Sequence, residues 1–187
     1  INAEKKTLNI VRIGTSGSVQ ADVPVHSFVI SEMSLGIDGV LRFYRDNEMV
    51  CDAAFEEAFI KECHWTPLAA RPYAVKASDD LVDKLHTEGV TVTLTANGFY
   101  GPQGRVLRLP IEMPTVNDEI ARFEFGNYKI VNYEMESAAI AGLAALMGHR
   151  ATTICLIIAN RVNGDASADY KPHMKKLIEY TLNSLIR

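Results

Sequence analysis

The sequence predicts an α/β fold of three layers, in which a mostly parallel central sheet has helices on both faces. Apolar runs rich in β-branched residues alternate with stretches of helical periodicity along the chain. The runs at 8–13 and 151–159 are too uniformly apolar to leave one face in water, as expected for strands in a covered parallel sheet. No repeat or linker interrupts this alternation, so we expect one domain over residues 1–187.

The first half of the chain supplies a strand at 8–13, which Gly14 ends, and a second strand at 25–30. Turn residues make 36–46 a loop. Residues 47–63 then read as an amphipathic helix, because apolar side chains recur on one face; they are Val50, Ala54, Phe55, Ala58 and Phe59. A short strand follows at 73–77, and Ser78 is a candidate N-cap for a helix that runs to His86 and stops before Gly89.

The second half begins with a strand at 90–96, where five of the seven residues are β-branched. A helix at 115–125, capped by Thr115 or Asn117, precedes a strand at 128–131 and an alanine-rich helix at 137–147. The strand at 151–159 is the most hydrophobic of the set. The closing helix at 170–186 tolerates Pro172 in its first turn, and its inward positions are Met174, Leu177, Ile178, Leu182 and Leu185.

Composition argues against several classes of protein, among them nucleic-acid-binding and membrane-spanning proteins. The net charge of −4 does not suggest a nucleic-acid groove, and no apolar run approaches the ~20 residues of a membrane helix. Cys51, Cys63 and Cys155 lack CxxC spacing, so we expect neither a metal site nor a disulfide framework, and a reducing, cytoplasmic location fits. The chain begins with Ile1 and not with Met, which indicates that it starts inside a longer gene product.

Four polar clusters follow strands of the expected sheet, at 12–18, 99–105, 134–136 and 160–161. The Gly14–Ser18 turn could direct N–H groups at an anion, although most Gly/Ser turns hold nothing. The loop 99–105 suits a flat heterocycle, or it is an ordinary surface turn with a packed Phe99. Glu134 and Glu136 are either ligand-binding acids or solvated acids in the first turn of a helix. If the clusters converge at one sheet edge, they form a site for a nucleoside and a phosphate.

Three motifs carry a family resemblance, and they read Arg12-Ile13-Gly14-Thr15-Ser16-Gly17, Phe99-Tyr100-Gly101-Pro102-Gln103-Gly104-Arg105 and Asn132-Tyr133-Glu134-Met135-Glu136-Ser137. With them the chain resembles the hexameric-type nucleoside phosphorylase and nucleosidase family, and within it the uridine phosphorylases. The resemblance runs over nearly the whole chain. Roughly the first third of the family fold, with a glycine-rich loop and a further phosphate-binding arginine, has no counterpart here, so we expect an N-terminally truncated form.

The resemblance implies a role for each site residue. Arg12 and Thr15 match the phosphate contacts. Phe99 would stack on the base, while Gln103, Arg105 and Arg161 would serve its polar edges. Glu134, Met135 and Glu136 match the ribose contacts. The residues expected to carry catalysis are Arg12, Gln103, Arg105 and Glu136.

The implied reaction is the reversible phosphorolysis of uridine to uracil and ribose-1-phosphate, with phosphate as co-substrate and no metal or other cofactor. A homo-oligomer, a dimer or a hexamer, is implied as well. Purine-specific relatives carry an aspartate after the last central strand, whereas here Asn160-Arg161 follows and the first acid is Asp165. The alternatives are a truncated, non-catalytic lobe and a purine nucleoside phosphorylase or nucleosidase.

Overall fold

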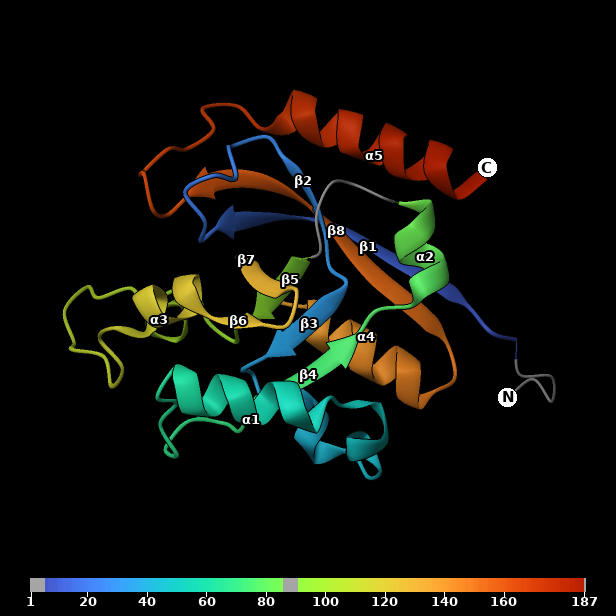
Figure 1. The fold of residues 1–187 in the computed structure, drawn as a ribbon. Coiled ribbons are helices and arrows are strands. Elements are labelled where there is room, and N and C mark those ends of the chain that lie inside the picture. The colour runs from blue at the N-terminus through green and yellow to red at the C-terminus, as the bar shows by residue number, and fades with distance from the viewer. Residues whose placement is uncertain (1–5, 86–90, 187) are drawn as a thin grey trace.

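The computed structural model describes residues 6–85 and 91–186, which form an eight-stranded mixed sheet with helices packed on it (Figure 1). The strands are β1 (Asn9–Ser18), β2 (Phe28–Ile30), β3 (Met33–Gly36), β4 (Tyr73–Lys76), β5 (Thr91–Thr95), β6 (Glu124–Phe125), β7 (Tyr128–Glu134) and β8 (Arg150–Asn160). The α-helices are α1 (Ala53–Glu62), α2 (Asp79–Lys84), α3 (Val116–Arg122), α4 (Ser137–Leu146) and α5 (Lys171–Ile186). Three 3₁₀ turns are η1 (Val40–Phe43), η2 (Asn47–Val50) and η3 (Gly101–Gln103).

The sheet consists of two groups of strands that meet over a short length. Its order is β2-β8-β1-β7-β5-β3-β4, with β6 added beside β7. The long ladders are parallel: β1 pairs with β8, and β5 pairs with both β3 and β7. The sheet is therefore mostly parallel, as predicted. The two groups join where β1 pairs antiparallel with β7 through Gly17↔Tyr133 and Ser18↔Asn132. The carboxyl ends of β1, β7 and β8 therefore come together at this junction.

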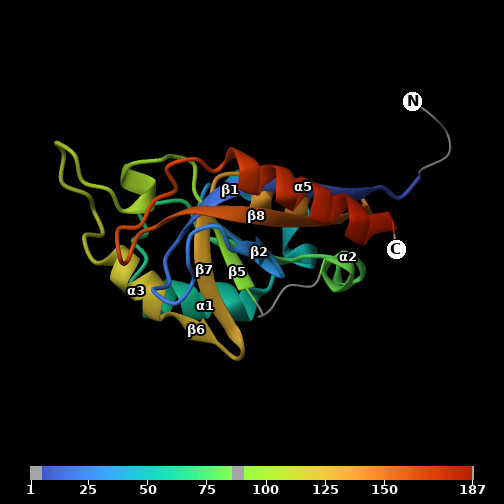
Figure 2. The same ribbon diagram turned by 90° about the horizontal axis from the view of Figure 1, so that it is seen from above.

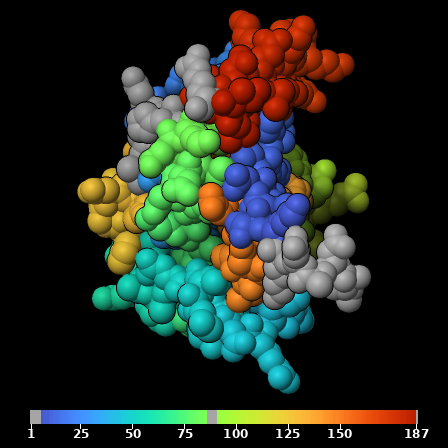
Figure 3. Space-filling model, turned by 90° about the vertical axis from the view of Figure 1, so that its right-hand side faces the viewer, coloured from blue at the N-terminus to red at the C-terminus, as the bar shows by residue number. Residues whose placement is uncertain are grey.

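Helices cover both faces of the sheet, which confirms the expected layers (Figure 2). Alternate residues of β4 show this directly: Tyr73 and Val75 pack with Ala138 and Ala141 of α4, while Ala74 packs in the cluster that contains Phe55 of α1. Leu177 of α5 lies in one apolar cluster with Ile154 and Leu156 of β8. Figure 3 shows the face at the start of β1, where α2 and α5 lie beside the strand and the 40–60 segment lies below.

Several sequence predictions of local structure are wrong. Gly14–Ser18 is not a turn, because β1 continues to Ser18 along the eleven-residue β8, with a bulge between Ser16 and Gly17. β3 was not predicted; its four residues are buried on both faces, too short a run to show a period. The helix expected at 47–63 begins only at Ala53, since the Asp52 carboxylate caps it by accepting from the Phe55 N–H.

The predicted helix at 115–125 ends at Arg122 and gives way to β6, which turns back onto β7. Ser78 does precede α2, but its hydroxyl accepts from the Ala151 N–H and makes no cap bond to the helix. The expected helix end at His86 and Gly89, and the first residue of the strand predicted at 90–96, lie outside the described residues.

Candidate functional site

A cavity of about 370 Å³ lies at the junction of the two strand groups. β1 and β8 end at this junction, toward the left of Figure 1. It lies outside the carboxyl ends of β1, β7 and β8, the usual position for ligands in open α/β sheets. All nine residues assigned to the site from the sequence line this cavity; they are Arg12, Thr15, Phe99, Gln103, Arg105, Glu134, Met135, Glu136 and Arg161. The convergence that the sequence analysis required is therefore present, while the role of each residue stays a prediction.

Arg12 lies flat on β1 because the neighbouring position on its face is a glycine. A methyl group at Gly14 would lie 2.6 Å from Arg12 Nη1 and 2.8 Å from Cζ, which is closer than side-chain carbons come. The guanidinium also donates to Cys155 Sγ at 3.5 Å across the ladder to β8. Gly14 thus serves the close packing of Arg12 on the strand and not the tight turn that was predicted.

Glu134 is a buried carboxylate, and both of its oxygens bind other groups of the protein. Its Oε2 accepts from the N–H groups of Glu136 and Ser137, each at 2.8 Å, and lies 3.1 Å from Arg12 Nη1. Its Oε1 accepts from the Thr95 hydroxyl. These bonds satisfy the first N–H groups of α4 and complement the helix dipole. Glu134 therefore orients Arg12 and the start of α4.

Glu136 is the more accessible of the two acids. Its side chain is 53% exposed, and Oε2 pairs with Arg12 Nη2. One guanidinium is thus matched by two carboxylates within the described residues. Thr15 adds a side chain to this end of the cavity. Two carboxylates outnumber the one guanidinium at this end of the cavity, and the expected phosphate contact at Arg12 and Thr15 stays a prediction.

The opposite end of the cavity carries a surplus of positive charge around Gln103. The amide oxygen of this buried residue accepts from Arg105 Nη1 at 2.7 Å and also from Arg161 Nη2. Arg161 Nη1 additionally donates to the Gln103 carbonyl at 2.9 Å. Two guanidinium donors on one oxygen fix the amide, with its NH₂ group at the other end. In the described part of the chain, neither arginine pairs with a carboxylate and nothing accepts from Gln103 Nε2.

Burial and like charge make this arginine pair electrostatically unfavourable without a ligand. Burial, and then the neighbouring Arg105 cation, lower the pKa of Arg161 to about 10. Burial also lowers the pKa of Arg105. The Arg161 guanidinium lies over the Tyr133 ring at 4.5 Å, which offsets part of this cost. This end of the cavity therefore favours an electron-rich or anionic group.

Flat and apolar side chains complete the walls. Phe99 is 53% exposed, and Arg105 covers one ring face with Cζ 3.9 Å from the ring centroid. The Tyr100 ring also lies 5.4 Å from the Phe99 ring in a T-shaped arrangement, and the expected stacking of Phe99 on a base stays a prediction. Met135 follows Glu134 and lines the cavity at 39% exposure.

Sequence reasoning missed two residues that hold this arrangement. Tyr133 lies inside a quoted motif but was assigned no role; it carries Arg161 on its ring and donates from its hydroxyl to Asn117 Oδ1 at 3.2 Å. Asn117 was considered only as a helix cap. Its Nδ2 donates to the carbonyls of Gln103 and Gly104, at 3.2 and 3.4 Å. These bonds connect α3 to residues 99–105, which we call the base loop. No spacing in the sequence signals such a contact.

Asn160, singled out with Arg161 as a polar pair, does not line the cavity. Its Nδ2 donates to the carbonyls of Gln20 and Val23, and its Oδ1 accepts from the N–H of Val162. It thus holds the loops that flank the end of β8.

Residues 6–85 and 91–186 contain no group of three or more His, Cys, Asp and Glu side chains arranged to hold a metal ion. None of their helices combines the length and apolar character needed to cross a membrane.

Similar proteins were found by sequence. The uridine phosphorylase of Thermococcus kodakarensis is 23% identical over 161 residues, which are 83% of this chain and 50% of that protein. A DeoD-type purine nucleoside phosphorylase of Actinobacillus succinogenes is 27% identical over 180 residues, covering 95% and 63%. The chain thus spans about half to two thirds of the length of these curated relatives.

A solved structure shares the fold. The Trypanosoma brucei nucleoside phosphorylase, described as showing uridine phosphorylase activity, superposes with a TM-score of 0.82 at 23% identity, over 95% of this chain and 63% of that one. The sequence profile described as Phosphorylase superfamily matches residues 5–184. Because that match spans nearly the whole chain, and the fold agrees with it, the chain belongs to the Phosphorylase superfamily.

Proposed function

We propose that this chain carries the nucleoside site of a uridine phosphorylase. The observation that supports this most is the Gln103 amide oxygen held by two guanidinium groups, Arg105 and Arg161, that have no carboxylate partner among the described residues. A uracil ring offers two carbonyl oxygens and one N–H. The Gln103 Nε2 donor and the nearby guanidinium groups suit such carbonyls, and Phe99 offers a face for the ring.

The same groups suit the proposed reaction. Breaking the bond between the ribose C1′ and uracil N1 leaves the electron pair on uracil, where the carbonyl oxygens share it, and positive charge on the ribose. Arg105 and Arg161 would then bind the transition state more strongly than uridine. A phosphate oxygen forms the new bond to C1′, which yields ribose-1-phosphate. Glu136 would accept from ribose hydroxyls once phosphate draws Arg12 away from it.

A purine substrate is the second candidate, because a DeoD-type purine nucleoside phosphorylase matches 95% of the chain. Its proposed proton donor would be an acid after β8. Here Asp165 lies in that loop but does not line the cavity, whereas Arg161 does. A cation at this place favours a carbonyl-rich pyrimidine over a purine nitrogen that needs a proton.

Separate calorimetric titrations with uracil, hypoxanthine and phosphate test the proposal on this chain. We expect uracil to bind more tightly than hypoxanthine. Phosphate should bind weakly, since two carboxylates already match Arg12. Arg105→Ala should weaken uracil binding. Arg108→Ala, three residues further along the chain, is the matched control because Arg108 is exposed and does not line the cavity. Equal losses for the two variants, or tighter hypoxanthine binding, would overturn the proposal.

Turnover is followed as uracil release from uridine with and without phosphate. Where turnover occurs, Arg105→Ala should lower kcat about 10²–10³-fold, as for the loss of one transition-state donor. Uracil binding without phosphate-dependent turnover would favour the alternative of a non-catalytic lobe.

A further inference from the structure

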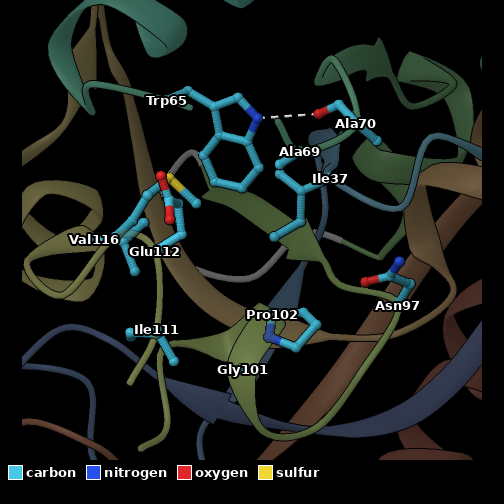
Figure 4. Close-up of a pocket in the computed structure, with 11 residues that line it drawn as sticks. Ile37, Trp65, Ala69, Ala70, Asn97, Gly101, Pro102, Ile111, Glu112 and Val116 are labelled. Carbon is cyan, nitrogen blue, oxygen red and sulfur yellow. Dashed lines mark hydrogen bonds between the residues drawn. The ribbon is translucent and has the colours of Figure 1, made fainter. Parts of the chain in front are cut away.

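A second cavity, also about 370 Å³, lies beside the base loop and shares no lining residue with the candidate site. Its walls include Trp65, Ile37 after β3, Asn97 after β5, Pro102 of η3, and Ile111 with Glu112 before α3 (Figure 4). We call it the Trp65 cavity. Like the candidate site, it lies outside the carboxyl ends of parallel strands, and its volume is within the range of small-molecule pockets.

The aromatic wall of this cavity is held in place before any ligand arrives. Trp65 Nε1 donates to the Ala70 carbonyl at 3.0 Å, and the indole packs at a tilt on Phe59 with centroids 5.6 Å apart. Pro102 lies across the space from the indole, while Ile37 and Ile111 flank it. The indole and the Pro102 ring thus offer apolar surfaces on opposite sides of the space, which suits a flat ring between them.

The polar side chains of the cavity, Glu112 and Asn97, indicate which ligand charge it favours. Glu112 and Asn97 lie at different sides of the space, and neither has a hydrogen-bond or ion-pair partner within residues 6–85 and 91–186. Among the residues that the structure describes, no lysine or arginine lines the cavity. An unpaired carboxylate and an unpaired amide carbonyl accept hydrogen bonds, so they favour a ligand that donates them and disfavour an anion.

We propose that the Trp65 cavity is a second small-molecule site for a flat aromatic ring that carries an amidinium or amino group. The ring lies between Trp65 and Pro102, and its N–H donors reach Glu112 and the Asn97 carbonyl. This site is separate from the nucleoside site and does not depend on the function proposed above. Pro102 directly precedes Gln103, so an occupant contacts the loop that also walls the candidate site.

Trp65 is the single tryptophan of the chain, so its fluorescence reports on this cavity alone. Benzamidine, benzamide and benzoate are matched probes, since they share one ring and differ in charge. We expect saturable quenching with benzamidine, weaker binding of benzamide and none of benzoate. Excess uracil should not displace benzamidine. Linear quenching that is equal for the three probes, tight benzoate binding, or displacement by uracil would overturn the proposal.

Glu112→Gln removes the charge of an exposed residue and is expected to fold normally, which far-UV circular dichroism checks. It should weaken benzamidine binding roughly two- to fivefold, the effect of losing one exposed ion pair, and leave benzamide binding unchanged. Glu124→Gln is the control, because Glu124 is also exposed and does not line the cavity. Unchanged benzamidine affinity in Glu112→Gln, or an equal loss in Glu124→Gln, would contradict the assignment.

Discussion

Two acids one residue apart, Glu134 and Glu136, have different physical tasks. Glu134 is buried and occupied by backbone N–H groups, a hydroxyl and Arg12, whereas the Glu136 side chain is half exposed and bonded to Arg12 alone. Hydrogen bonds to a buried charge contribute more than an exposed ion pair. The interpretation of both residues as acids at a helix start thus describes part of what Glu134 does. The alternative, a ligand-binding acid, fits Glu136 better.

Replacing each acid with glutamine should separate these tasks. Glu134→Gln is expected to lower the free energy of unfolding by about 1.5–3 kcal/mol, since charged hydrogen bonds to α4 and Arg12 are lost. Glu136→Gln should cost less than about 1 kcal/mol. Urea denaturation of both variants measures the difference, provided that the slope m stays constant. Equal destabilisation of the two variants would show that the Glu134 carboxylate does not stabilise the first N–H groups of α4.

The thiols should be unreactive in the native protein. Burial raises the pKa of Cys155 to about 12, that of Cys63 to about 12 and that of Cys51 to about 11, all above the ordinary value of 9.0. At pH 8 all three are neutral, so we expect slow reaction with a disulfide reagent in buffer and fast reaction of three thiols in urea.

The same shifts predict a direction for stability. A pKa raised by folding favours the neutral thiol, so this stabilisation is complete below pH 9 and is lost as pH rises toward the folded values of about 11 and 12. The urea midpoint should therefore fall above pH 9. Rapid native labelling of Cys63 or Cys155 at pH 8 would contradict the burial of these two side chains.

At the scale of elements, the base loop depends on one glycine and one helix. Gly104 ends η3 with φ +69°, and a methyl group there would lie 2.3 Å from Asn117 Nδ2. Asn117 projects from α3 and bonds to the loop and to Tyr133 on β7. Asn117 of α3, which is itself bonded to Tyr133 of β7, thus holds the backbone at Gln103 and Gly104.

Gly104→Ala and Gly148→Ala test this coupling as a pair. Both positions have positive φ, but Gly148 has nothing within 4 Å of an added methyl group. Each should lose about 1–2 kcal/mol to the left-handed backbone. Gly104→Ala should lose more by thermal unfolding, and it alone should weaken uracil binding, since Asn117 must move. Equal effects would indicate that the Asn117 contact does not position the loop.

At the scale of the whole molecule, the candidate site bridges two groups of strands that otherwise pair over only two positions. Arg12 and Arg161 come from the β1–β8 group, while Glu134 and the base loop come from the β7–β5–β3 group. α4 packs on strands of both groups, and its first residue, Ser137, donates its N–H to the Glu134 carboxylate. A ligand that contacts both groups should stabilise their junction.

Hydrogen exchange with and without saturating uracil checks this expectation. We expect slower exchange in the last residues of β1 and in 99–105 together, because binding to the native state stabilises every contact that opening must break. α1 is the internal control, since it lies outside the site. Protection confined to one strand group would mean that uracil does not span the junction.

The layered α/β fold, the family and nine of the residues that line the cavity could be predicted from the amino-acid sequence alone, because apolar periodicity and short motifs are local. It could not determine that Gly14 lies in a strand, that Glu134 caps α4 or that Asn117 holds Gln103. Those depend on atoms brought together from distant positions. The charge balance of the site followed only from the folded arrangement, because Coulomb interactions depend on separation in space and on burial. Two carboxylates pair with Arg12, whereas Arg105 and Arg161 have no carboxylate partner among the described residues.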